Sequence, residues 1–338
     1  MLSELIDRAV ALLPAQVRET GYLRPRYPLV GIELREDAAI AVRLARRGTR
    51  YHLAGHAQRH LAPGVFSASL LRSEVGDPPA LLRAVQDALQ MAGAASANRV
   101  SVALPDTSAR VFVVDLEELP RSAAQAAEVI RFRIKKSVPF RPEEARLSWQ
   151  PLGRSEDGRV QVLVAVAPET VIAPLESLLA SAGLRVGLVG LASFDVFNAL
   201  RLVDYAGGAS GDVGLLNATP TYFSLMIHRG ERLILYRSKG YHVQGGFQGE
   251  ESLRVVGREL RSTLGYYEEH LLGEGIGALH VRVAGIDAAG LLEAVAASTT
   301  APVREASLEA LLPEIGALPD GVAPELLPAL GLALRRVA

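Results

Sequence analysis

The stretch of residues 119–151, LPRSAAQAAEVIRFRIKKSVPFRPEEARLSWQP, decides the fold, because it separates two halves of the chain that resemble each other. From Ala123 to Ile134 its apolar residues recur near helical spacing, and Ser122 can cap the start of that helix. Pro139 and Pro142 cannot continue the helix, because each lacks a backbone N–H and favours extended geometry in the residue before it. We therefore expect one amphipathic helix, followed by a turn, with an apolar side made of Ala127, Ile130, Phe132 and Ile134.

Two strands and a second helix complete this block. Residues 146–152 are predicted as a strand, residues 153–158 as a polar turn, and residues 159–168 as a second strand in which valine alternates with other residues. Residues 169–182 have the apolar spacing of a second amphipathic helix. The block from residue 106 to residue 183 is therefore predicted to be a compact α+β insert.

The segments on either side of the insert repeat one pattern, which is three short strands, a helix and a further strand. These elements are predicted at residues 29–55, 80–91 and 99–104, and again at 213–236, 252–272 and 279–283. The spacing from Gly31 to Gly48 nearly matches that from Gly214 to Gly230. Repetition over such long blocks indicates a duplicated domain rather than a solenoid of short repeats. We expect a first half at residues 29–105, and its end together with the second half at residues 184–338.

Residues 1–28 precede the first half. Leu2 to Leu13 has the apolar spacing of a short amphipathic helix, and the remaining residues to Pro28 read as an extended connector. Because the polar face of this helix carries Glu4 and Asp7 and is not rich in Lys and Arg as membrane-surface helices are, we expect it to dock on the protein body.

The composition argues against several classes of function. The 338 residues are 49% hydrophobic, which is enough for about two domains. The 36 Lys and Arg against 37 Asp and Glu leave a net charge of −1, so nucleic acid is not an expected partner. Without cysteine the chain has no disulfide or thiolate chemistry, which fits the cytoplasm. No apolar run reaches the roughly 18 residues that span a bilayer, so we expect a soluble or peripheral protein.

Five short motifs follow one another in a characteristic order. They are Leu119-Pro120, Val138-Pro139-Phe140, residues 162–168 with the helix after them, Gly183-Leu184 leading to Ser193-Phe194, and the closing residues 329–335. Together they resemble the type IV pilus assembly protein PilM family, which is itself similar to the cell-division protein FtsA. The resemblance implies an α/β, duplicated actin-like (ribonuclease H-like) two-lobed fold with a small insert in the first half.

The resemblance also implies a role. Proteins of the PilM family lie on the cytoplasmic face of the inner membrane, bind the short N-terminal segment of the bitopic protein PilN, and help to couple the pilus motor to the envelope complex. For this chain it implies a scaffold that contacts the membrane through its partner and holds the partner's peptide in a channel between the insert and the first-half core. The apolar residues expected along that channel are Ile130, Ile134, Val138, Phe140 and Trp149.

Actin-like proteins hold nucleotide phosphates on two hairpin turns, where an Asp manages the metal and a small residue lets backbone N–H groups approach the anion. The first of these turns falls on Glu33 to Glu36, followed by Asp37. Arg35 replaces the glycine of the turn, and Glu36 would face a phosphate with like charge. This turn is therefore predicted to be degenerate.

The other two nucleotide elements are also altered. The second phosphate turn falls on Asn217 to Thr219, and Pro220 removes a further N–H. The Gly-Gly that contacts adenosine in the family is Ala284-Gly285 in this chain. We therefore expect a pseudo-ATPase with no catalytic residue and no cofactor, with ATP and Mg²⁺ disfavoured.

Other interpretations remain open. Because a fold does not fix a function, the chain could be an active ATPase or a small-molecule kinase of the same fold. It could also be an adaptor similar to FtsA or to the type II secretion protein GspL. His52, His56 and His60 have no acidic neighbour and read as surface histidines, so no metal site is expected. The densest cluster of basic residues is Arg131, Arg133, Lys135, Lys136 and Arg141. Three interpretations of this cluster are open: it faces acidic lipid, a protein partner or only solvent.

Overall fold

The computed structural model describes residues 27–47, 50–70, 73–155, 157–201, 211–230, 232–241, 246–271, 273–307 and 323–335. The helix predicted at residues 2–13 and nearly all of the connector after it lie outside these ranges.

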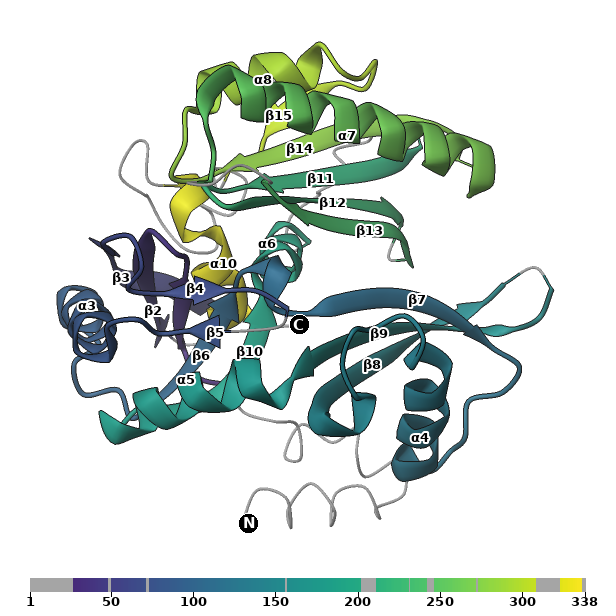
Figure 1. The fold of residues 1–338 in the computed structure, drawn as a ribbon. Helices are drawn as coiled ribbons and strands as arrows, with labels where there is room; N and C mark the ends of the chain where they lie inside the picture. Colours follow the sequence, from purple (N-terminus) through teal and green to yellow (C-terminus); the bar gives the residue numbers. More distant parts are fainter. Residues whose placement is uncertain are drawn as a thin grey trace.

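Two five-stranded sheets share one topology (Figure 1). In each sheet three strands form an antiparallel meander, and two further strands add in parallel beside the first of them. The first sheet, in the order β10-β6-β1-β2-β3, contains β1 (Val30–Leu34), β2 (Ala38–Arg47), β3 (Arg50–His60), β6 (Arg99–Leu104) and β10 (Arg185–Leu191). The second, in the order β13-β12-β11-β14-β15, contains β11 (Asp212–Ala218), β12 (Tyr222–Arg229), β13 (Arg232–Gly240), β14 (Ile276–Val283) and β15 (Val303–Glu305). The predicted duplication is confirmed by this correspondence.

Helices cover the outer face of each sheet. The first sheet packs against α3 (Pro78–Met91) and α5 (Glu169–Ser181), and the second against α7 (Gly249–His270) and α8 (Ala288–Ala296). Capping residues fix where two of these helices begin. Asp77 Oδ1 accepts the N–H of Ala80 at 2.9 Å at the start of α3, and the Asp287 side chain accepts backbone N–H groups at the start of α8. By its packing α5 groups with the first sheet, although the sequence analysis placed it in the insert.

Two helices join the halves from within. α6 (Ala192–Leu200) and α10 (Ala323–Leu334) share one hydrophobic cluster with β2 and β11, between the two sheets. Glycine permits this close packing: a Cβ on Gly331 would lie 1.8 Å from the backbone oxygen of Asp195, and one on Gly31 would lie 1.9 Å from that of Ala329.

The insert is a three-stranded antiparallel sheet with one helix on one face. Its strands are β7 (Arg110–Leu116), β8 (Ala145–Arg154) and β9 (Val160–Pro168), in the order β7-β9-β8, and its helix is α4 (Ala123–Ile134). The sequence analysis did not predict β7. A two-stranded hairpin of β4 (Ser67–Ala68) and β5 (Ser73–Glu74) and the 3-10 turns Asp106–Ser108 and Pro142–Glu144 complete the described elements.

Helix α4 differs from its prediction at one position. Ile130 and Ile134 are 0% and 1% exposed in the insert core, whereas Phe132 is 83% exposed. Each helical residue advances by about 100°, so Phe132 is turned about 200° from Ile130. Its assignment to the apolar, core-facing side was therefore wrong. Ser122 stands at the N-cap position, but its side chain makes no capping hydrogen bond.

Among the described residues, no helix combines the length and the apolar character needed to cross a bilayer.

Candidate functional site

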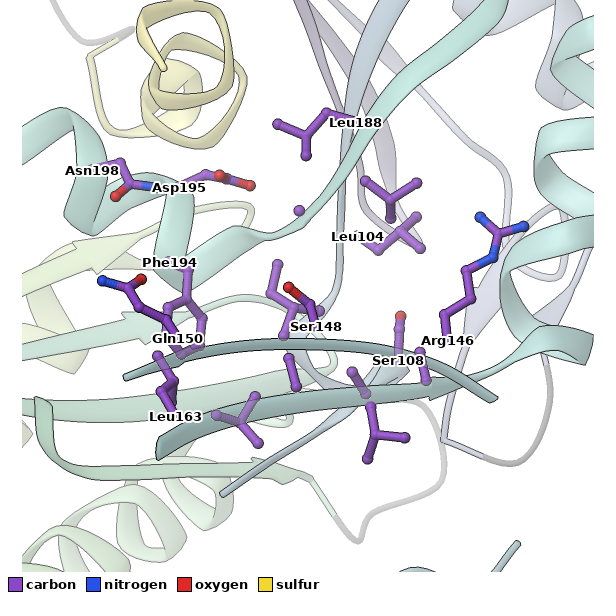
Figure 2. Close-up of a pocket in the computed structure, with 18 of the residues that line it drawn as sticks. Leu104, Ser108, Arg146, Ser148, Gln150, Leu163, Leu188, Phe194, Asp195 and Asn198 are labelled. Atoms are coloured by element: carbon purple, nitrogen blue, oxygen red, sulfur yellow. The ribbon is translucent and has the colours of Figure 1, made fainter. Parts of the chain in front are cut away.

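A groove with a volume of about 570 Å³ lies between the insert and the first sheet. Its floor is the face of the insert sheet that α4 does not cover. Ser148 and Gln150 of β8 and Leu163 and Ala165 of β9 pair across that floor, in the register Ser148↔Ala165 and Gln150↔Leu163. Figure 2 shows Ser148, Gln150 and Leu163 on this side of the groove and Leu188 on the other.

The opposite wall is the edge of the first sheet. Six consecutive residues of β10, from Val186 to Leu191, line the groove, although side chains of a strand alternate between its two faces. The groove therefore meets the strand edge-on. Within the described ranges β10 pairs only with β6, and β8 pairs only with β9. Two strands with one unpaired side each thus line the same groove.

One end of the groove is closed by an ion cluster. Arg146 on β8 donates to Glu169 at 2.7 and 2.9 Å and to Glu176 at 2.6 and 2.7 Å, and both carboxylates belong to α5. These hydrogen bonds from Arg146 hold the pKa of Glu169 below its ordinary value. The cluster ties the insert to the body of the first half.

The other end is formed by α6 and the end of α10. Phe194 and Asn198 line it beside the buried Asp195 (Figure 2). Arg201 and Arg335 line the same end. Burial raises the pKa of Asp195 to about 8, against the attraction of Arg335 and a hydrogen bond from Asn198. Gly190 makes room for this group, since a Cβ there would lie 2.1 Å from Asp195 Oδ2. This end combines cationic side chains with an acid that burial holds neutral near pH 7.

This arrangement suits an extended peptide. An unpaired strand edge offers backbone N–H and C=O groups with the spacing that a further β-strand needs. When a peptide pairs with this edge, its alternate side chains enter the space on either side of the sheet. Leu188, Val189 and Leu191 offer apolar surface along β10, and Ser148 and Gln150 offer polar groups across the floor.

The structure places the five predicted channel residues mostly elsewhere. Ile130, Ile134 and Val138 are buried in the insert core, and Phe140 packs half-buried against the same cluster. Trp149 lies along the groove on β8, but it packs with the same α4 cluster. The groove is on the reverse face of the sheet, so the sequence analysis missed Ser148 and Gln150. Their alternation with Trp149 along β8 was the available signal.

The three predicted nucleotide turns do converge. Gly285, with a φ of +71°, lies against the other two turns: a Cβ there would be 2.7 Å from Asp37 Oδ2 and 2.9 Å from Pro220 Cγ. Arg35, which is 2% exposed, binds Asp37 at 2.8 Å and also pairs with Glu325. Glu325 in turn accepts the N–H of Gly285 at 2.9 Å. Protein side chains therefore fill the space between the turns.

Arg282 binds the two lobes together beneath these turns. From β14 it donates to Glu33 of β1 at 2.8 Å, to Asn217 of β11 at 3.0 Å and to the backbone oxygen of Pro324 at 2.7 Å. The side chains of Arg282 and Glu33 are 0% and 1% exposed. Burial raises the pKa of Glu33, and the adjacent guanidinium opposes that rise. The predicted turn residues Glu33 and Asn217 are thus brought together by a residue that the sequence analysis did not single out.

A second buried cluster continues from Asn217. Its side-chain amide donates to Ser193 Oγ at 2.9 Å, and Ser193 binds Asp106 through its hydroxyl and through its N–H, the latter at 3.0 Å. Burial raises the pKa of Asp106, although the hydrogen bonds from Ser193 oppose the rise. Because all three side chains are fully buried, the cluster joins α6 to the second sheet and is closed to substrates. Thr219 binds the backbone oxygen of Tyr222 at 3.0 Å within its own turn, next to Ala284.

No group of three or more His, Cys, Asp or Glu side chains suited to a metal ion occurs among the described residues. His52, His56 and His60 all lie on β3 and are not such a group.

Comparisons with known proteins address the fold. No family model matches the chain, and no curated protein matches it. Among solved structures it is similar to a chain of a PilM-PilN type IV pilus biogenesis complex, with 20% identity, a TM-score of 0.76, and coverage of 93% of this chain and 100% of that one. The predicted two-lobed actin-like fold is confirmed.

Two further solved structures are more distant. A Bacteroides thetaiotaomicron protein with an actin-like ATPase fold has 10% identity and a TM-score of 0.49, and covers 84% of this chain and 92% of its own. The cytoplasmic domain of EpsL, an inner-membrane component of the Vibrio cholerae type II secretion system, has 11% identity and a TM-score of 0.48, and covers 91% and 93%.

Proposed function

We propose that this chain is a cytoplasmic scaffold of type IV pilus biogenesis. It binds the N-terminal peptide of a bitopic inner-membrane protein similar to PilN, is held at the inner membrane through that partner, and links it to the pilus motor. The observation that carries this proposal is the groove that β8 and β10 line, each of which has one unpaired side among the described strands. The likeness to the PilM-PilN complex supports the choice of partner.

The groove favours a peptide in extended form over a small molecule. Its apolar wall is a strand edge rather than a closed pocket, so main-chain hydrogen bonds can supply affinity along its length. Arg201 and Arg335 line one end of the groove, and Glu176, which pairs with Arg146, lines the other. This difference in charge between the two ends favours one direction of the peptide.

The same protein is proposed to be a pseudo-ATPase. Phosphate binding needs N–H groups that are free to approach the anion, whereas in the two phosphate turns the N–H groups of Arg35 and Thr219 are bonded to backbone oxygens within their own turns, each at 2.9 Å. In the adenosine turn the N–H of Gly285 is bonded to Glu325. A nucleotide could enter only by displacing the ion pairs of Arg35 and Arg282, which hold the lobes together. Titration with Mg-ATP in a thermal-shift assay tests this, because a ligand that binds only the folded state raises Tm. A rise in Tm that saturates with Mg-ATP concentration would refute the pseudo-ATPase proposal and favour an ATPase or kinase function.

Fluorescence anisotropy tests the peptide function. The probe is a labelled synthetic peptide with the cytoplasmic N-terminal sequence of the PilN-like protein encoded in the same genome. Leu188→Glu and Ser148→Trp, which place a charge and bulk in the groove, are each expected to weaken binding by about tenfold or more. Met91→Glu is the matched control, since Met91 is 58% exposed on α3, away from the groove.

Hydrogen exchange locates the peptide. Amides along β10 are expected to gain protection on binding, because a guest strand pairs with its outer side. Wild-type affinity in both groove variants, or protection confined to elements other than β8 and β10, would refute this site.

A further inference from the structure

The outward face of α4 carries apolar side chains that no described residue covers. Phe132 is 83% exposed and Val129 is 38% exposed. Gln125, Val129, Phe132 and Lys136 follow helical spacing and form one row, opposite the buried Ile130 and Ile134. An aromatic side chain so exposed at the centre of a helix face has no role in the packing of the insert.

Basic side chains follow this row towards the end of α4, whereas the exposed Glu128 lies beside Val129, one turn before Phe132. Between Val129 and Arg141 the sequence has five basic residues and no acidic one. Arg131 turns inward and donates to the backbone oxygen of Pro142 at 3.1 Å, and Arg141 pairs with Glu144 at 2.6 Å. Arg133, Lys135 and Lys136 are exposed, and no ion pair of theirs occurs among the residues that the structure describes. We call the exposed set of Val129, Phe132, Arg133, Lys135 and Lys136 the α4 patch.

We propose that the α4 patch binds the surface of an anionic phospholipid bilayer directly. Phe132 and Val129 enter the boundary between headgroups and acyl chains, and the long side chains of Arg133, Lys135 and Lys136 reach the phosphates. The charge complementarity favours lipid over a second copy of this chain, whose equivalent patch would carry the same positive charge. Two apolar side chains are also too few for the contiguous core of a stable protein interface.

The proposal goes beyond the proposed function, because it requires no partner peptide. It is compatible with that function, since α4 covers one face of the insert sheet (Figure 1) and the groove residues of β8 and β9 lie on the other. The bilayer and the peptide can therefore be bound at once. Two weak attachments to one membrane increase the residence of the protein there through effective concentration.

Vesicle co-sedimentation with the purified full chain and no added peptide tests the proposal. The probes are vesicles of equal parts phosphatidylglycerol and phosphatidylcholine, and vesicles of phosphatidylcholine alone. The chain is expected to sediment with the anionic vesicles only, and to be released as salt is raised to about 0.5 M. Phe132→Ser, and separately Lys135→Glu with Lys136→Glu, are each expected to lower the vesicle partition coefficient by about tenfold or more.

Matched controls come from the rest of the surface. Tyr266→Ser alters another exposed aromatic side chain, which is 50% exposed on α7. Arg83→Glu with Arg258→Glu reverses two exposed charges on α3 and α7. Both controls are expected to sediment as the wild type does. Because the altered side chains are exposed, all variants should keep the wild-type Tm.

Three results would overturn the proposal. They are no sedimentation of the wild type with anionic vesicles, equal sedimentation with both kinds of vesicle, and binding that survives the α4 variants. A dimer in solution that Phe132→Ser dissociates would assign the α4 patch to self-association instead. Peptide anisotropy on the same variants separates the two hypotheses, because α4 variants should keep peptide affinity and Leu188→Glu should keep vesicle binding.

Discussion

Replacing Arg282 by Met should destabilise the protein more than most single substitutions. Arg282 and Glu33 are 0% and 1% exposed, and the guanidinium is the described donor to the Glu33 carboxylate, 2.8 Å away. Without it, a buried carboxylate, the amide oxygen of Asn217 and the backbone oxygen of Pro324 all lose a donor. Breaking a buried pair by removing one partner costs about 3–5 kcal/mol, because the other charge stays buried and uncompensated. We expect a loss of that size in the free energy of unfolding.

A double-mutant cycle separates this mechanism from lost packing. Glu33→Leu with Arg282→Met replaces both charges by apolar groups, and such replacements of a whole buried pair are often neutral. We therefore expect the double variant to lie within about 1–2 kcal/mol of the wild type, with a coupling energy of at least about 2 kcal/mol. The assay is urea unfolding at pH 7, followed by far-UV circular dichroism. A loss below about 1 kcal/mol for Arg282→Met, or simple additivity in the double variant, would refute the view that this pair locks the lobes together.

Three further predictions concern stability. The pKa of Asp195 is raised to about 8, so the folded state holds a proton that the unfolded state releases, and stability should fall as pH rises from about 4 towards 8. Asp195→Asn should remove most of this slope, which is about 4 kcal/mol in urea unfolding from pH 5 to pH 8.5. Burial lowers the pKa of His228 to about 3, so stability should fall as pH drops below about 6.5, by about 2 kcal/mol at pH 5, and His228→Phe should abolish that fall in thermal melts at both pH values. Gly265→Ala on α7, where a Cβ meets nothing within 4 Å, should raise the free energy of unfolding by about 0.5–1 kcal/mol. Gly331→Ala should lower it by about 3 kcal/mol or more, because its Cβ would overlap the backbone oxygen of Asp195. Equal effects of the two substitutions in calorimetry would contradict this packing.

The elements of both halves could be predicted because their signals are local. Alternating valines mark β9, and the prolines after Lys136 end α4. Most predicted strands were too short, because pairing with neighbours extends β3 to His60 and β13 to Gly240 beyond their apolar stretches. The strand β7, Arg110–Leu116, was missed although its residues 111–114 are a run of valine and phenylalanine, so a local signal was available there too.

The sites depend on information that no local pattern holds. The resemblance indicated a groove beside the insert, but which face of β8 forms it depends on which face α4 covers. Arg282 and Glu33 are 249 positions apart, and an arginine in the middle of a strand gives no sign of a buried partner in the other lobe. The degenerate nucleotide turns could be predicted from the sequence, because losing a glycine always adds a Cβ to the turn and adding a proline always removes a backbone N–H.

The two halves leave corresponding strands at the edges of their sheets, and these edges differ. β15 has three residues, of which Arg304 and Glu305 are exposed, whereas β10 has seven and carries no charge after Arg185. Short charged edges resist pairing with other chains, and long uncharged ones invite it. If the proposed peptide pairs with β10, the protein without it leaves this long uncharged edge open to strand exchange and aggregation. We therefore expect co-expression of the peptide to raise the soluble yield over that of the chain expressed alone, as gel analysis of the soluble fraction would show.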